Sequence, residues 1–323
     1  MMSIPEVSVI IPHKGRSELL VKTLCSLARL DYPPDAFEVL VMTQEPALTL
    51  PPAHNPCSAL LLHQPAAWTI SQLRNAGAAR ARGEYLVFLD ADVEIPADWL
   101  TVMLGELGVP GRVLVGSVQR CVPAATLIQR VRAALSSLAG TTEVEALIST
   151  NMVCRACDFF RCGGFPPQLR TCEDSYFSGK MRELGTLYCT AQTYCFHLGE
   201  DPDFATLLRK EVWRSMGNMQ SMRGRQIPLR EYPSYGVPLS LVLAAIFFLW
   251  SVAARRPLWA AGAAGWMLLV PTVYALRLLR FDRTLPIVGT WLYYGVYFAG
   301  RAAGTAGGVY REVCPQRTSG LVP

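Results

Sequence analysis

Short apolar runs alternate with helix-like segments over the first 90 residues of the chain. Four runs rich in β-branched and other large apolar residues predict strands at 7–11, 37–42, 59–62 and 85–89. Between the first two, Leu20, Leu24 and Leu27 recur at helical spacing, and a second helix is expected over 70–82, closed by Gly83. Fully apolar strands that alternate with helices predict an α/β fold with a mostly parallel sheet covered on both faces.

Ligands of such sheets bind beyond the carboxyl ends of the strands. Pro12 directly follows the first predicted strand, Glu45 comes three residues after the second, and Asp90 directly follows the fourth. These positions are therefore the first candidates for binding a cofactor or substrate.

The pattern is less regular between the fourth strand and the apolar carboxyl-terminal part. Further strands are expected at 113–118 and 148–153, with a helix over 126–138 between them and another helix starting near Glu173. The segment 204–222 is amphipathic and basic. It either lies on a membrane surface or packs under the active site.

Three apolar segments follow, at 236–254, 258–276 and 285–300. The first two are uncharged and contain 19 residues each, which is long enough to cross about 30 Å of hydrocarbon. The third is shorter and is either a span or a re-entrant piece. The whole chain is 51% hydrophobic and only 17% charged, with a mean hydropathy of +0.25. These values exclude a disordered chain and favour a membrane protein.

The net charge of +5 is unevenly distributed along the chain. Residues 1–235 contain 22 Lys and Arg against 23 Asp and Glu, whereas 236–310 contain 6 against 1. A nucleic-acid-binding protein carries its basic surplus on the folded domain, where it neutralises phosphates. We therefore expect membrane lipids with anionic head groups as partners, and no nucleic acid.

The cations that flank the apolar segments predict their orientation. Six precede the first segment: Arg209, Lys210, Arg214, Arg223, Arg225 and Arg230. They predict that the preceding domain is cytoplasmic, in agreement with the absence of a secretory signal before the first strand. Arg255 and Arg256 would then lie in an outer turn, against the positive-inside rule, and a re-entrant hairpin over 236–276 would remove this conflict.

Two carboxylates stand at the end of the fourth predicted strand. Asp90 and Asp92 are separated by one residue, so an extended chain directs both side chains to the same side. Paired hard oxygen ligands suit Mg²⁺ or Mn²⁺ bound to a diphosphate. The alternative is a solvated turn without a ligand.

Three segments carry a family resemblance. VSVIIP from Val7, LRNAGAARARGEYLVFLDADVEIP from Leu73 and RCGGFPPQLRTCEDSYFSGKMRELG from Arg161 resemble, in order and spacing, the signatures of family 2 glycosyltransferases. The resemblance covers about residues 5–215. It implies a GT-A fold and an inverting transferase that takes a sugar from a nucleotide-diphosphate donor with a divalent metal.

The resemblance also implies roles for particular residues. Asp90 would contact the donor's nucleoside or the metal, and Asp92 would bind the metal. Asp174 of the Glu173-Asp174 pair would be the catalytic base. The structural alternative is that both acids only cap a helix. The remaining implied positions are acceptor-side Gly163, Gly164 and Phe165, acceptor-side Arg209 and Trp213, and donor-side Arg74, Asn75 and His197.

The chain also departs from the family pattern. The usual acidic pair after the second strand is absent, and Glu45 is the expected substitute, which leaves the nucleotide open. The Q-x-x-R-W motif of processive members is only partly matched, at 209–213, so repeated chain extension is not supported.

Three features have a second, purely structural interpretation. His197 is either near the donor phosphates or a packed histidine, and Arg74 with Asn75 either reaches the donor or lies on a solvated helix face. The cysteines 154, 157, 162 and 172 lack full zinc-finger spacing, so small buried thiols are favoured over a zinc site.

Together these features predict four parts: a GT-A domain over 1–203, an interfacial helical linker over 204–235, transmembrane or re-entrant helices over 236–310, and a tail over 311–323 ending in a tag-like TSGLVP. The predicted function is a membrane-anchored glycosyltransferase with a nucleotide-sugar donor, Mg²⁺ or Mn²⁺, and a lipid-linked hydroxyl acceptor. The alternatives are transfer to a polyprenyl phosphate, or a non-catalytic nucleotide-binding transport or scaffold protein.

Overall fold

The computed structural model describes residues 5–223 and 229–313. The chain divides into two compact units. The first contains Met1–Pro123 and Ala139–Glu200, and the second contains Ala124–Leu138 and Asp201–Pro323. Arg225 and the tag-like end of the tail lie outside the described residues.

The first unit is built on one mixed sheet of nine strands, which lie in the order β3-β2-β1-β4-β8-β6-β9-β5, with β7 paired to β9. The strands are β1 (Val7–His13), β2 (Phe37–Thr43), β3 (Leu60–His63), β4 (Tyr85–Leu89), β5 (Val93–Glu94), β6 (Arg112–Arg120), β7 (Thr142–Glu143), β8 (Asn151–Arg155) and β9 (Thr186–His197). The four strands from β3 to β4 are parallel, and β8 is antiparallel to both neighbours. The predicted α/β fold with a mostly parallel sheet is confirmed, while the strand expected at 148–153 starts three residues later.

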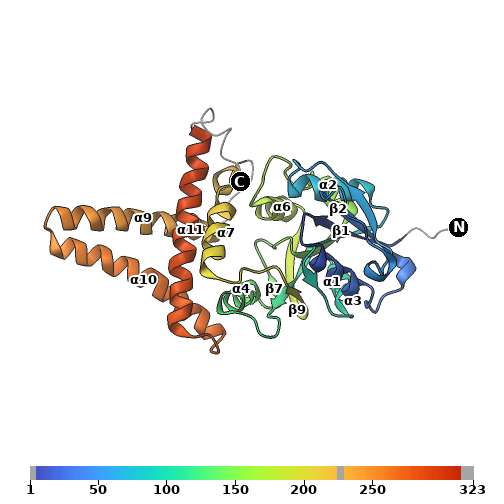
Figure 1. Ribbon diagram of the computed structural model, residues 1–323, viewed down its shortest axis with the longest axis horizontal. Coiled ribbons are helices and arrows are strands. Elements are labelled where there is room, and N and C mark those ends of the chain that lie inside the picture. Colours follow the sequence, from blue (N-terminus) through green and yellow to red (C-terminus); the bar gives the residue numbers. More distant parts are fainter. Residues whose placement is uncertain (1–4, 224–228, 314–323) are drawn as a thin grey trace. The chain divides into compact units, whose positions relative to one another are not determined.

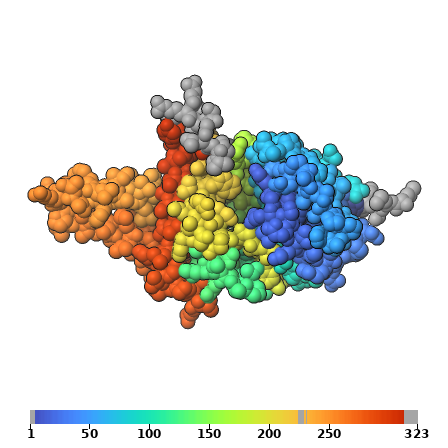
Figure 2. Space-filling view, in the orientation of Figure 1, coloured from blue at the N-terminus to red at the C-terminus, as the bar shows by residue number. Residues whose placement is uncertain are grey.

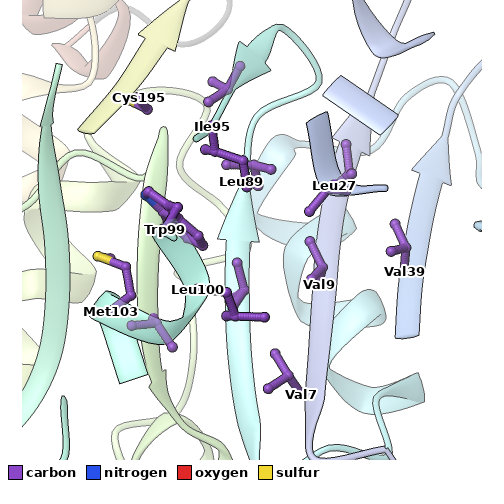
Figure 3. Packing of buried hydrophobic residues seen from close by; sticks show 14 of the residues in the cluster. Val7, Val9, Leu27, Val39, Leu89, Ile95, Trp99, Leu100, Met103 and Cys195 are labelled. Carbon is purple, nitrogen blue, oxygen red and sulfur yellow. The ribbon is translucent and has the colours of Figure 1, made fainter. Parts of the chain in front are cut away.

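Helices cover both faces of this sheet (Figure 1). They are α1 (Ser17–Leu27), α2 (Ile70–Arg80), α3 (Trp99–Leu107), α5 (Ala156–Arg161) and α6 (Glu173–Arg182), with short 3₁₀ turns η1 (Pro34–Ala36) and η2 (Pro52–His54). Because side chains alternate along a strand, Val9 faces α1 and α3 whereas Ile10 faces α2. Figure 3 shows the first of these cores, where Trp99 and Leu100 pack beside Leu89 and Val9.

Strand register brings the functional residues to one edge of the sheet. Ile10 of β1 pairs with Phe88 of β4, so the segments that follow these two strands leave the sheet together. Val93 of β5 pairs with His197 at the end of β9. The pairing of β5 with β9 therefore carries His197 to the residues that follow β4.

The second unit is helical. It contains α4 (Leu127–Ser137), α7 (Phe204–Ser215), α8 (Asn218–Ser221), η3 (Leu229–Glu231), α9 (Tyr232–Ala253), α10 (Pro257–Phe281) and α11 (Ile287–Val313). The amphipathic segment 204–222 is thus two helices, with Gly217 before the second. Glu211 of α7 is fully buried and is paired with Arg132, Arg214 and Arg301 at 3.1, 2.7 and 3.5 Å.

Helices α9 and α10 pack against each other as a hairpin and expose apolar side chains over most of their length (orange in Figures 1 and 2). Within the described residues, these two helices are long and apolar enough to cross a membrane. The third apolar segment lies in α11, which does not meet that criterion. Instead α11 packs closely on α7, where a Cβ added at Gly300 or Gly304 would collide with that helix.

Candidate functional site

Asp90 and Asp92 leave the edge of the sheet directly after β4. The backbone N–H of Asp90 donates to the carbonyl of Thr150 at 3.1 Å, and the carbonyl of Asp92 accepts from the N–H of Leu198 at 2.8 Å. These two bonds tie the segment after β4 to the residue before β8 and to the residue after β9. The side chain of Asp92 is 9% exposed and that of Asp90 is 24% exposed, so neither carboxylate is a freely solvated turn residue.

Asp92 is contacted by residues from two other parts of the chain. Its Oδ2 lies 2.9 Å from Nη2 of Arg16, and its Oδ1 lies 3.2 Å from Nε2 of His197. A Cβ at position 199 would collide with the Asp92 carboxylate and with Arg16. Glycine at this position therefore allows the chain after β9 to pass beside Asp92.

Asp90, Asp92 and His197 form a potential metal site. One ligand atom from each residue lies within 4.8 Å of the others, and within the described part of the chain these three are the group of acids, histidines and cysteines that meets this criterion. Two carboxylates with one imidazole fit Mn²⁺, which accepts both oxygen and nitrogen ligands. The residues present therefore fit a divalent cation.

Arg74 joins the two acidic groups of the site. Its guanidinium is 1% exposed, with Nη2 donating to Oδ1 of Asp90 and Nη1 donating to Oε1 of Glu173, both at 2.9 Å. The solvated-face interpretation of Arg74 is excluded by this burial. Both terminal nitrogens are held by acids, so Arg74 connects the end of β4 to the start of α6.

Asn75 and the loop of Gly163, Gly164 and Phe165 lie next to Arg74. The Asn75 side chain donates to the carbonyl of Phe165 at 2.8 Å and accepts from its N–H at 2.9 Å. Phe165 is fully buried, and its ring lies 5.2 Å from the Arg74 guanidinium carbon. Gly163 and Gly164 have φ of +87° and +70°, a conformation that favours glycine. The buried ring of Phe165 thus packs against the guanidinium of Arg74.

Glu173 and Asp174 begin α6, as the sequence predicts. Oδ1 of Asp174 accepts from the N–H of Ser175 at 2.7 Å. Burial and the neighbouring Glu173 raise the pKa of Asp174 to about 7. Burial also raises the pKa of Asp90, against the opposing effect of Arg74. Asp174 is therefore poised to exchange a proton near neutral pH.

His197 has a strongly raised pKa. Burial lowers it, but hydrogen bonds to Asp92 and Glu200 outweigh burial and raise the pKa to about 10. His197 is therefore more than a packed side chain. Without a metal, its protonated ring forms ion pairs with both Asp92 and Glu200.

Glu45 and Pro12 lie at the carboxyl ends of the first two strands. Oε1 of Glu45 accepts from the N–H of Gly15 at 2.9 Å, while Pro12 is buried and pairs with Met42. Burial lowers the pKa of the neighbouring His13. Instead of an acidic pair, the segment after β2 has the single acid Glu45, which is hydrogen-bonded to the loop after β1.

Arg209 and Trp213 belong to the second unit, on α7. Arg209 donates to the hydroxyl of Thr206 at 3.3 Å, and Trp213 is exposed. Their acceptor-side role stays a prediction. Among the cysteines considered for zinc, Cys154 is buried and Cys157 exposed, and the metal-binding group found in the described chain contains no cysteine.

Sequence reasoning missed the residues that hold the metal-binding group in place. Arg16 and Glu200 contact Asp92 and His197, and Gln119 donates to Glu200 at 3.3 Å. Glu200 lies three residues after His197, but no local pattern marks this pair. Arg16 and Gln119 are far away in sequence, and only the strand pairing of the folded unit brings them close.

The Arg74 bridge makes a prediction for stability. Arg74→Met removes the cation between two buried acids and should lower the free energy of unfolding by about 3–5 kcal/mol. The matched control is Lys180→Met, because Lys180 pairs with Glu183, which is 54% exposed, and an exposed pair contributes about 0–1 kcal/mol. Thermal unfolding of the full-length variants measures both. Equal small losses would contradict the bridge.

Comparison with known proteins supports the same fold. The Glycosyl transferase family 2 model matches residues 8–163. Mannosyltransferase PcManGT from Pyrobaculum calidifontis, solved in complex with GDP-Man and Mn²⁺, is 19% identical, with a TM-score of 0.64 over 96% of this chain and 88% of that chain. No protein in the curated set matches significantly.

Two further solved structures match with lower scores. S. aureus TarS is 15% identical, with a TM-score of 0.48 over 95% of this chain and 92% of that chain. GalNAc-T7, solved with UDP, GalNAc and Mn²⁺, is 14% identical, with a TM-score of 0.48 over 70% of this chain and 52% of that chain. With the family match and the GT-A-like sheet together, the chain carries a glycosyltransferase domain of family 2, an enzyme class that uses nucleotide sugars.

Proposed function

We propose that this protein is a membrane-anchored, inverting glycosyltransferase that moves a sugar from a nucleotide-diphosphate donor to a hydroxyl of a lipid-linked acceptor. The observation that carries the proposal is the arrangement of Asp90, Asp92 and His197 around a potential cation site, with Arg74 linking Asp90 to Glu173 beside Asp174. Cation ligands and a proton acceptor are the two groups that glycosyl transfer to a hydroxyl needs.

Donor binding is assigned to the edge of the sheet after β1, β2 and β4. Asp90, Asp92 and His197 would hold Mg²⁺ or Mn²⁺, and a bound divalent cation neutralises negative charge on a diphosphate leaving group. Glu45 and Pro12 would border the nucleoside, since both lie at strand ends of the same edge. PcManGT was solved with GDP-Man and Mn²⁺, which supports a donor of the same chemical class.

Asp174 is proposed as the base that accepts the proton of the acceptor hydroxyl. A carboxylate with a pKa of about 7 both persists as a base at neutral pH and binds a proton readily. Glu173 is paired with Arg74, and its negative charge raises the pKa of Asp174. An acceptor phosphate is already anionic and needs no base, so this arrangement favours a hydroxyl acceptor over a polyprenyl phosphate.

The α9–α10 hairpin is proposed as the membrane anchor. At 1.5 Å per residue, the 22 residues of α9 and the 25 of α10 span about 33 and 37 Å, enough for a hydrocarbon core of about 30 Å. Trp250, Trp259 and Phe247 stack on one another near the turn, and Arg256 lies 5.8 Å from the Trp259 ring. Aromatic and cationic residues at the ends of apolar helices are typical of membrane–water interfaces.

A membrane anchor bears on the acceptor and on the side of the membrane. A soluble acceptor needs no anchored enzyme, so a lipid-linked acceptor that meets the donor at the bilayer surface is the economical interpretation. The basic residues that precede α9 favour a cytoplasmic catalytic domain.

The base assignment predicts the effect of Asp174→Asn. An amide cannot accept the hydroxyl proton, so sugar transfer should fall by about 10²–10⁴-fold, while affinity for the nucleotide-sugar donor with Mn²⁺ changes little. The control is Glu183→Gln, which alters an exposed acid that follows the same helix and pairs with Lys180. Transfer is measured with radiolabelled donor and a membrane extract as the acceptor source. Wild-type turnover by Asp174→Asn would instead support transfer to a phosphate.

The same base sets the pH dependence of transfer. Because the pKa of Asp174 is raised to about 7, the carboxylate is protonated and inactive below that pH. The value of kcat/KM should rise about tenfold per pH unit up to about 7 and level off above it. A flat profile between pH 5 and 8 would contradict this role for Asp174.

The anchor makes a prediction for membrane insertion. Leu243, Ile246 and Leu249 are exposed on α9, so replacing all three by Glu should leave the packing of the unit intact but oppose burial in lipid. We expect the wild type to resist extraction from membranes at alkaline pH and the triple variant to be released. Leu60→Glu changes an exposed leucine in the first unit and should behave like wild type. Release of the wild type itself would contradict a spanning anchor.

A further inference from the structure

We infer that Glu200, supported by Gln119, is a positioning residue that fixes His197 as the nitrogen ligand of the divalent cation. The inference rests on the proposed metal site and extends it to residues that do not contact the cation. It concerns the orientation and tautomer of one ring, which decide whether that ring can bind a metal at all.

The imidazole of His197 lies between two acids. Its Nδ1 is 2.9 Å from Oε1 of Glu200, and its Nε2 is 3.2 Å from Oδ1 of Asp92. A carboxylate only accepts hydrogen bonds, so Nδ1 carries the hydrogen that binds Glu200. While Glu200 holds the Nδ1 hydrogen, Nε2 is the nitrogen that can release its hydrogen, which Asp92 accepts in the absence of a metal, and bind a cation held by Asp92.

Glu200 is itself held rigidly enough for this role. Its side chain is 5% exposed, and Nε2 of Gln119 donates to its Oε1 at 3.3 Å. Gln119 lies on β6 and pairs with Cys195 of β9, two residues before His197. The pairing of β6 with β9 therefore fixes the position of Gln119 relative to His197. Glu200, in the loop after β9, contacts both side chains.

The arrangement matches a recurring design of metal sites. A histidine ligand usually donates its second ring hydrogen to a carboxylate or carbonyl, which orients the ring and increases its basicity. Loss of such a partner typically weakens metal binding by about 10–100-fold. Glu200 has the chemistry, the contact and the burial for this role, and no residue of the proposed reaction otherwise needs it.

The test is the affinity of the full-length protein, in detergent, for Mn²⁺ measured by electron paramagnetic resonance. Glu200→Ala should weaken Mn²⁺ binding by about 10–100-fold, and Glu200→Gln should weaken it less, because the amide oxygen still accepts a hydrogen bond. The matched control is Glu106→Gln, which alters another buried glutamate that contacts Thr190 and Gln192 rather than the acids of the site. It should bind Mn²⁺ like wild type.

A spectroscopic readout separates ligand orientation from general damage. Electron spin echo modulation should show coupling of Mn²⁺ to nitrogen in the wild type, no such coupling in His197→Ala, and reduced coupling in Glu200→Ala. If Glu200→Ala does not fold, as judged by circular dichroism, Glu200→Gln is compared with Glu106→Gln in the same way. If the Glu200 variants bind Mn²⁺ with wild-type affinity and show wild-type coupling to nitrogen, the inference about Glu200 is overturned, while the proposed metal site stands. Failure of the wild type to bind Mn²⁺ would overturn the proposed metal site together with it.

Discussion

The buried guanidinium of Arg74 between Asp90 and Glu173 is the interaction on which the site depends. Carboxylates withdrawn from water are costly unless a cation and hydrogen bonds compensate them. Arg74 compensates two at once, with 2.9 Å bonds from separate nitrogens. A planar guanidinium makes these bonds from two nitrogens in fixed positions, whereas a lysine would have to make both from a single nitrogen. The acids after β4 and the acids at the start of α6 are therefore held in a fixed relation.

This bridge explains how neighbouring acids take different roles. Glu173 keeps a direct cationic partner, whereas Asp174 bonds to a backbone N–H and has its pKa raised to about 7. Asp92 in turn has Arg16 and His197 as partners on two sides. Acids that are close in sequence thus have different hydrogen-bond partners, which allows one to bind a cation or an arginine while its neighbour exchanges a proton.

The sequence was informative where local spacing determines structure. The strand before Asp90, its end at the edge of the sheet and the helix that starts at Glu173 all follow from patterns of a few residues, and the structure has them. Arg16 and Glu200 could not be found in this way, because β5 has only two residues and its pairing with β9 leaves no periodic signal. For 285–300, an apolar run fits a lipid-facing helix and a packed helix equally well. The contact of Gly300 and Gly304 of α11 with α7 could not be read from the apolar run either.

The central claim is that two acids at the edge of the sheet bind a diphosphate through a divalent cation, and calorimetric titration of UDP and GDP tests it most directly. With Mn²⁺, the full-length protein should bind one of the two nucleotides at least about tenfold more tightly than with chelator. Asp92→Asn should lose that gain, because Asp92 is one of the three proposed ligands. Nucleotide affinity that is the same with and without Mn²⁺ would contradict the account.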